Sequence, residues 1–131
     1  MKKARFAALF ILCLFILAAC SGEKEDILNM GINAEITGID EENKTLTVKD
    51  TGEKEILGSS CVIDCSEAYI IYCDYDTGDV GDIDFEDLVR GDDVILSIYD
   101  SQLELMEKGS ESIKADQVQL GTQRMKLENV W

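Results

Sequence analysis

The chain of 131 residues contains no histidine and no proline. Histidine is the usual general base near neutral pH and the commonest metal ligand, so its absence removes many catalytic and zinc-binding arrangements. Carboxylates and lysines can still transfer protons, which leaves a carboxylate-based enzyme open. Aromatic residues are also few, with one Trp, four Tyr and four Phe, and this limits the surfaces on which a ligand can stack.

Positive charge is scarce as well. The chain has 12 Lys and Arg against 27 Asp and Glu, a net charge of −15. A surface of this kind repels the phosphates of nucleic acids and anionic lipid headgroups. We therefore expect no nucleic-acid partner and interpret most of the acidic residues as a solvated surface.

Only one hydrophobic run is long, and it stands at the N-terminus. Lys2, Lys3 and Arg5 precede an uncharged run, 6–19, which is followed directly by Cys20. The run is too short to span the bilayer core, because a spanning helix needs roughly 20 residues. Its length is typical of the apolar region of a secretory signal peptide, which ends at small residues.

The end of this run, Leu17-Ala18-Ala19-Cys20, resembles the lipobox of bacterial lipoproteins. The resemblance implies that residues 1–19 are a cleaved signal peptide and that the sulfur of Cys20 carries a diacylglyceryl group. Two acyl chains suffice for stable attachment, so the expected location is the extracytoplasmic face of the cell membrane, with the bilayer as a partner. An ordinary signal peptide or an uncleaved anchor helix remains the alternative.

Cleavage before Cys20 would remove three basic residues and no acidic one, leaving 112 residues with a net charge of −18. We interpret residues 20–30 as the lipidated cysteine and a flexible tether. A single β domain is expected over 31–120, followed by a C-terminal tail over 121–131. One domain of ordinary size fits this length.

Alternating apolar residues predict strands in several segments. Around a turn centred near Glu42, a hairpin would place Ile36 opposite Val48 and Gly38 opposite Leu46. A second hairpin is expected around Glu67. The clearest strand lies in DDVILSIYD, residues 92–100.

Other segments carry turn or helix signals. The stretch TGDVGD predicts a loop, and FEDLV predicts one helical turn with Asp84 as its N-cap. Residues 102–108 are ambiguous between strand and helix, and 113–120 predict a final strand. Many short strands with little helix favour a small closed barrel or a sandwich.

Three stretches, GINAEITGIDEENKTLTVKD, DFEDLVRGDDVILSI and IKADQVQL, resemble strands of small lipoproteins of Gram-positive bacteria. The resemblance covers about residues 31–120 and implies a mainly β fold, an OB-like barrel of five strands. It carries no catalytic residue. Such barrels often bind oligonucleotides or oligosaccharides, and the acidic charge disfavours the first.

Three cysteines lie within the expected domain, Cys61, Cys65 and Cys73. On a straight strand Cys61 and Cys65 would lie roughly 13 Å apart, too far for a disulfide. The hairpin around Glu67 would instead place Cys61 opposite Cys73, so we predict that bond, with Cys65–Cys73 as the second choice. The alternative is that all three are small buried residues without a bond.

An acidic loop over 74–87 suggests a calcium site. Counting Asp76 as the first position of a twelve-residue loop places Asp84 and Asp87 at ligand positions. Gly78 and Val80 occupy two other ligand positions and have no side-chain oxygen. Any Ca²⁺ binding is therefore expected to be weak, and a solvated loop is the alternative.

The sequence thus predicts a membrane-anchored, non-enzymatic binding or interaction module without a cofactor, with an envelope protein or a glycan as its partner. The first alternative is a weak Ca²⁺-binding module that uses Asp76, Asp84 and Asp87. The second is an envelope enzyme built on carboxylates, for which no spacing selects particular residues; Asp64, Asp74 and Asp82 are examples.

Overall fold

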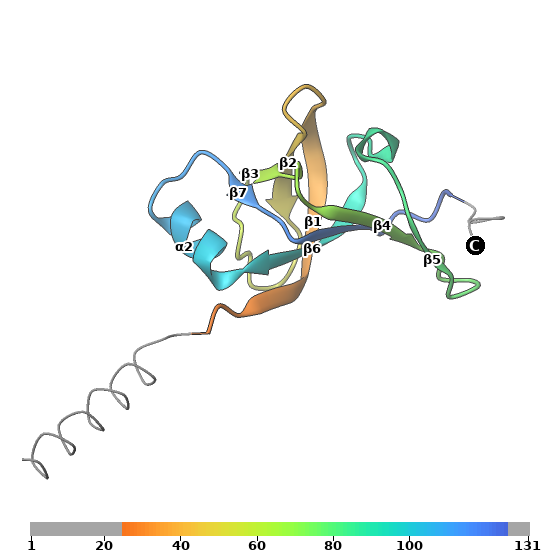
Figure 1. Ribbon diagram of the computed structural model, residues 1–131, viewed down its shortest axis with the longest axis horizontal. Coiled ribbons are helices and arrows are strands. Elements are labelled where there is room, and N and C mark those ends of the chain that lie inside the picture. The colour runs from red at the N-terminus through yellow and green to blue at the C-terminus, as the bar shows by residue number, and fades with distance from the viewer. Residues whose placement is uncertain (1–24, 126–131) are drawn as a thin grey trace, which may run out of the picture.

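A computed structural model describes residues 25–125 (Figure 1). The predictions for the signal peptide, for Cys20 and for residues 126–131 lie outside this range. The described residues form a mainly β fold, as the sequence predicts. Its strands are β1 (Leu28–Asp40), β2 (Thr45–Asp50), β3 (Cys61–Asp64), β4 (Tyr69–Cys73), β5 (Val80–Asp82), β6 (Asp93–Tyr99), β7 (Ile113–Lys114) and β8 (Gln117–Leu120).

Two helices accompany the strands. The 3₁₀ helix η1 (Phe85–Asp87) precedes β6, and the α-helix α2 (Asp100–Glu107) follows it directly. The ambiguous segment is therefore helical. In the range that the structure describes, neither helix has the length and apolar character needed to cross a membrane.

The strands form one sheet in the order β5-β4-β8-β6-β1-β2-β3-β7. The prediction of five strands in a closed barrel is wrong, because residues 25–125 form eight strands in a sheet that is not closed. Two features add strands that the sequence did not predict. A short strand, β5, forms inside the expected TGDVGD loop and pairs with β4, and the expected final strand is interrupted at residues 115–116, between β7 and β8.

The long strand β1 organises the sheet, since it pairs with β2 on one side and with β6 on the other. Ile36 lies opposite Val48, as predicted. A register shift follows between Ile36 and Gly38, so Gly38 lies opposite Thr47 and the predicted Gly38–Leu46 pairing is wrong. Such a bulge adds a residue to one strand and increases its local twist.

The core forms where alternate side chains of neighbouring strands point to the same side. Val94, Leu96 and Ile98 of β6 are all buried, as their spacing predicts. The other strands contribute the rest of the apolar core, together with Phe85 and Leu88. Burial of this apolar surface is the main favourable contribution to folding.

The second predicted hairpin does not form. Strand β3 pairs with β2 and with β7, whereas β4 pairs with β5 and with β8. Residues 113–120, which are distant in the sequence, thus provide a partner for each of the two strands. The residues around Glu67 connect separate parts of the sheet.

The boundaries of the β domain differ slightly from the predicted range of 31–120. Strand β1 begins at Leu28, within the expected tether. At the other end, Thr122 Oγ1 accepts a hydrogen bond from the N–H of Asp93 at 2.9 Å, and Met125 packs against the core. The first part of the expected tail therefore belongs to the folded domain.

Candidate functional site

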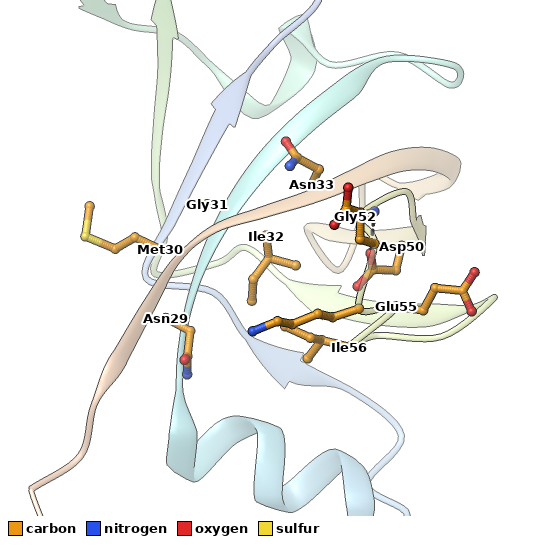
Figure 2. Close-up of a pocket in the computed structure, with 11 residues that line it drawn as sticks. Asn29, Met30, Gly31, Ile32, Asn33, Asp50, Gly52, Glu55 and Ile56 are labelled. Atoms are coloured by element: carbon orange, nitrogen blue, oxygen red, sulfur yellow. Dashed lines mark hydrogen bonds between the residues drawn. The ribbon is translucent and has the colours of Figure 1, made fainter.

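A hollow of about 420 Å³ lies beside the start of β1, between residues 29–33 and the turn at 50–56 (Figure 2). Figure 2 shows Asn29 and Met30 on one side of it and Asp50 and Glu55 on the other. The register of β1 against β6 shifts between Asn29 and Ile32. Gly31 in this bulge has φ +83°, a conformation that favours glycine.

The turn that forms the far wall of this hollow is held by Asp50. Its Oδ1 accepts a hydrogen bond from the N–H of Gly52 at 2.7 Å, and its Oδ2 accepts one from Leu57 at 2.9 Å. Leu57 is buried in the core, so the turn is anchored at both ends. The Asp50 carboxylate therefore has a structural role.

A second hollow, of about 370 Å³, lies on the other side of Asn33, which lines both. Ile95 and Gly121 also line it, and Thr51 and Tyr75 come from the turns after β2 and β4. A side chain at Gly121 would crowd the neighbouring strand, because its Cβ would lie 3.2 Å from the backbone oxygen of Asp93. The Tyr75 side chain is 58% exposed and offers an aromatic ring at the surface.

Gln123 connects the turn that carries Tyr75 to the end of β8. Its Oε1 accepts a hydrogen bond from the N–H of Tyr75 at 2.9 Å. Its Nε2 donates to the backbone oxygens of Cys73 at 2.9 Å and Gly121 at 3.2 Å. One amide thus satisfies three backbone groups and restrains the position of Tyr75.

The three cysteines of the domain are free thiols. The predicted Cys61–Cys73 disulfide is absent, and so is the Cys65–Cys73 alternative, because the hairpin that would have aligned the two arms does not form. Cys61 and Cys65 are buried, as the other interpretation predicts, while Cys73 is only partly buried. The Sγ of Cys61 lies 3.8 Å from the Sδ of Met106 in α2.

Burial raises the pKa of the Cys61 thiol. For Cys65, burial and the neighbouring Asp64 carboxylate raise the pKa to about 12. Both thiols are therefore protonated near neutral pH and are poor nucleophiles. This argues against a cysteine-based reaction at either position.

The proposed calcium ligands lie in two different local structures. Asp84 and Asp87 are close together, because the Asp87 carboxylate accepts a hydrogen bond from the N–H of Asp84 at 2.9 Å. This contact stabilises the start of η1, for which Asp84 is the N-cap residue, as predicted. The N–H of Asp76 instead donates to Asp74 Oδ1 at 2.9 Å in the turn after β4.

No group of three acidic or cysteine side chains within residues 25–125 is arranged to hold a metal ion. Calcium binding by Asp76, Asp84 and Asp87 therefore stays a prediction without structural support.

Two of the three carboxylates named for an enzyme, Asp64 and Asp74, accept local hydrogen bonds. Hydrogen bonds from Ser66 lower the pKa of Asp64, and its Oδ1 accepts the N–H of Ser66 at 2.9 Å. Asp74 makes the turn contact described above, and Asp82 lies exposed on the edge strand β5. The pKa of Asp40 and of Glu86 is also lowered, by hydrogen bonds from Asn43 and from Lys44 respectively.

Sequence reasoning missed the residues that build the two hollows, above all Asn33, Tyr75 and Gln123. Asn33 and Gln123 belong to no sequence motif, and Tyr75 lies in the acidic loop over 74–87, which the sequence suggests only as a calcium site. The alternation in GINAEITGID does indicate that Asn33 points away from the core, since Ile32 and Ala34 are buried. No local signal indicates the long-range contact of Gln123.

Comparisons with known proteins returned no matching protein family, no similar curated protein and no similar solved structure.

Proposed function

We propose that the mature chain is a binding module held at the extracytoplasmic face of the cell membrane by lipid on Cys20. The single observation that carries this proposal is the N-terminal pattern of basic residues, an apolar run over 6–19, two alanines and Cys20. The polar sequence that follows Cys20 immediately leaves no room for a longer apolar span.

The chemistry of the two hollows supports a binding role without catalysis. Asp50, a carboxylate that lines the first hollow, already accepts hydrogen bonds from the backbone N–H groups of Gly52 and Leu57. Its hydrogen bonds hold the turn beside the first hollow, which gives this carboxylate a structural role.

We further propose that the strand order is OB-like. In support, β7 pairs in parallel with β3, and β8 pairs antiparallel with β6. Residues 113–120 would then act as one interrupted strand that connects the β1-β2-β3 part of the sheet to β6. The break at Ala115 and Asp116 is short, and both residues donate backbone hydrogen bonds, to Asp64 and Ser97 respectively.

The location is tested by mass spectrometry of the protein purified from cells. We expect a mature N-terminus at Cys20 with a diacylglyceryl modification, and we expect Cys20→Ala to release the protein from the membrane fraction. Cys13→Ala, which changes a cysteine within the apolar run, is the matched control and should leave the anchoring unchanged. An unmodified Cys20 in the wild-type protein would refute the proposal.

The binding role is tested by cross-linking on intact cells, followed by identification of the molecules captured by the wild-type protein. A saturable partner supports a binding module. Chemical conversion of a captured partner by the purified protein would contradict the non-enzymatic role and would favour the carboxylate-based alternative.

A further inference from the structure

The outer surface of the sheet carries a row of side chains that crosses four strands. Asn33 of β1 lies opposite Ile95 of β6, which lies opposite Gln119 of β8, which lies opposite Ile71 of β4. Their chain neighbours Ala34, Val94 and Leu120 are buried in the core, so the row points away from the core. With strands about 4.8 Å apart, the row is roughly 14 Å long.

A second row lies beside the first, two residues further along each strand. Gln117 of β8 lies opposite Tyr69 of β4. The partner of Gln117 on β6 is Ser97, which is only 3% exposed and does not contribute to the surface. Tyr69 is 69% exposed. We call the two rows together the neutral face; its members are Asn33, Ile71, Ile95, Gln119, Gln117 and Tyr69.

The neutral face contains no charged side chain, although the chain carries 27 acidic residues and a net charge of −15. The nearest acidic side chain of β1, Glu35, is paired with Lys49 at 3.1 Å. Two further carboxylates border the face: Asp93, where the second hollow begins, and the exposed Asp82 of β5, which lies opposite Ile71.

The amides of the neutral face are set apart from the others by their hydrogen bonding. Residues 25–125 contain seven Asn and Gln side chains, and four of these bond to protein groups: Asn29, Asn43, Gln102 and Gln123. The other three make no side-chain hydrogen bond to any described residue, and all of them, Asn33, Gln117 and Gln119, belong to the neutral face. Each offers both donors and an acceptor to a ligand.

The second hollow adjoins this face, because Asn33 and Ile95 line it. Tyr75 also lines this hollow and is 58% exposed, and its backbone is restrained by Gln123. An exposed tyrosine offers an apolar ring and a polar hydroxyl to the same ligand. The face and the hollow together form a continuous site of amides, aromatic rings and small apolar side chains.

We propose that the neutral face and the second hollow bind a neutral polysaccharide; this inference rests on the proposed function as a binding module. Sugar hydroxyls donate and accept hydrogen bonds, which matches the three unengaged amides. The apolar sides of sugar rings match Tyr75 and Tyr69. A neutral polysaccharide is not repelled by the acidic protein. Because the face has no charged side chain, binding does not require a charged group of the face to lose its water.

Other occupants fit this face less well. A nucleic acid would be repelled by the negative charge, and the face offers no Lys or Arg for its phosphates. A protein partner usually needs a more apolar centre, whereas Ile71 and Ile95 are the aliphatic residues here and are already partly buried.

The test is affinity electrophoresis of the full chain in a detergent without a sugar headgroup. Separate native gels contain dextran, laminarin, mannan or xylan, with polygalacturonate as the anionic comparison. Mobility is expressed relative to a gel without polysaccharide, so that changes in protein charge cancel. We expect at least one neutral polysaccharide to retard the wild-type protein, and polygalacturonate to leave its mobility unchanged.

The variants are chosen to change the neutral face without disturbing the core. Asn33→Asp and Gln119→Glu each add a negative charge to the face and should weaken binding by about tenfold, as expected when a carboxylate must be desolvated. Asn43→Asp adds the same charge in the turn after β1 and should bind as the wild type does. Tyr75→Phe should retain more affinity than Tyr75→Ala, since it keeps the ring.

Absence of retardation by all four neutral polysaccharides would overturn the inference. An equal effect of Asn33→Asp and Asn43→Asp would overturn it too, because binding would then lie elsewhere. If the protein carries lipid at Cys20 and captures a protein partner but no polysaccharide, this inference fails while the proposed function stands. If the bound polysaccharide is cleaved, the neutral face stands and the non-enzymatic function fails.

Discussion

The guanidinium of Arg124 forms an ion pair with the carboxylate of Asp92, whose side chain is 4% exposed. Asp92 is the one buried charged residue within 25–125. Its other oxygen accepts the N–H of Val89 at 2.9 Å, and Arg124 also donates to the backbone oxygen of Asp87. This pair connects the residues after β8 to the loop before β6, and it explains how a buried carboxylate is tolerated.

Removal of Arg124 should destabilise the protein. Arg124→Ala leaves the buried Asp92 without its positive partner, and we expect the free energy of unfolding to fall by about 1–3 kcal/mol, since Arg124 is itself partly exposed. Urea unfolding followed by circular dichroism measures the change. Arg90→Ala removes an exposed arginine of the same loop and should have an effect within about 0.5 kcal/mol. Equal losses in both variants would contradict this role of the pair.

Asp50 is expected to determine the shape of the first hollow. Asp50→Ala removes the acceptor for the N–H groups of Gly52 and Leu57, and the free energy of unfolding should fall by about 1–3 kcal/mol. Amide hydrogen exchange at Leu57 should accelerate. Asp50→Asn retains one oxygen acceptor and should lie between the wild type and the alanine variant. Unchanged protection of Leu57 in Asp50→Ala would show that other contacts hold the turn.

Two glycines of β1 should respond differently to alanine. Gly31 has φ +83° and open space around its Cβ position, so Gly31→Ala should cost about 1–2 kcal/mol through backbone strain. Gly38 has no positive φ, and its Cβ would make ordinary contact with Thr47 at 3.5 Å. Gly38→Ala should therefore be close to neutral. Chemical denaturation of both variants checks the difference, which would vanish if the bulge at Gly31 relaxed.

The buried thiol of Cys65 should make stability depend on alkaline pH. Its pKa is about 12 in the folded protein against 9.0 for an unperturbed thiol, so the unfolded chain loses this proton first as pH rises. The stabilising contribution is complete below pH 9.0 and is lost progressively between pH 9.0 and about 12.

Cys65→Ala should show a shallower fall in the free energy of unfolding over this pH interval than the wild type. The comparison uses slopes, because the substitution also leaves a cavity that lowers stability at every pH. Cys73→Ala removes a partly buried thiol and is the control. Parallel slopes for the wild type and Cys65→Ala would contradict the raised pKa.

Local pattern determined several features of this protein. The mainly β character follows from short alternating segments, and the spacing of Val94, Leu96 and Ile98 identified their buried face. The pairing of Ile36 with Val48 followed from one turn near Glu42. These features depend on residues close in the sequence, where periodicity and turn chemistry carry the information.

The bulge after Ile36 marks the first limit of such reasoning. Because of this register shift, Leu46 lies opposite Ile39 and not opposite Gly38, its predicted partner. A single added residue leaves the apolar alternation on either side intact, so the pattern contains little sign of it. The structure was needed to place it.

Long-range pairing decided the rest. Cys61 and Cys73 belong to strands that each bind a different part of residues 113–120, so the local hairpin and its disulfide do not form. Asn33 and Gln119 likewise share one face, and Asn33 and Tyr75 line one hollow, only because β1, β6, β8 and the turn after β4 lie side by side. The sequence by itself determined which side chains leave the core, through the alternation of each strand. Only the tertiary structure decided which strands are neighbours, because that choice depends on burying all the apolar faces together.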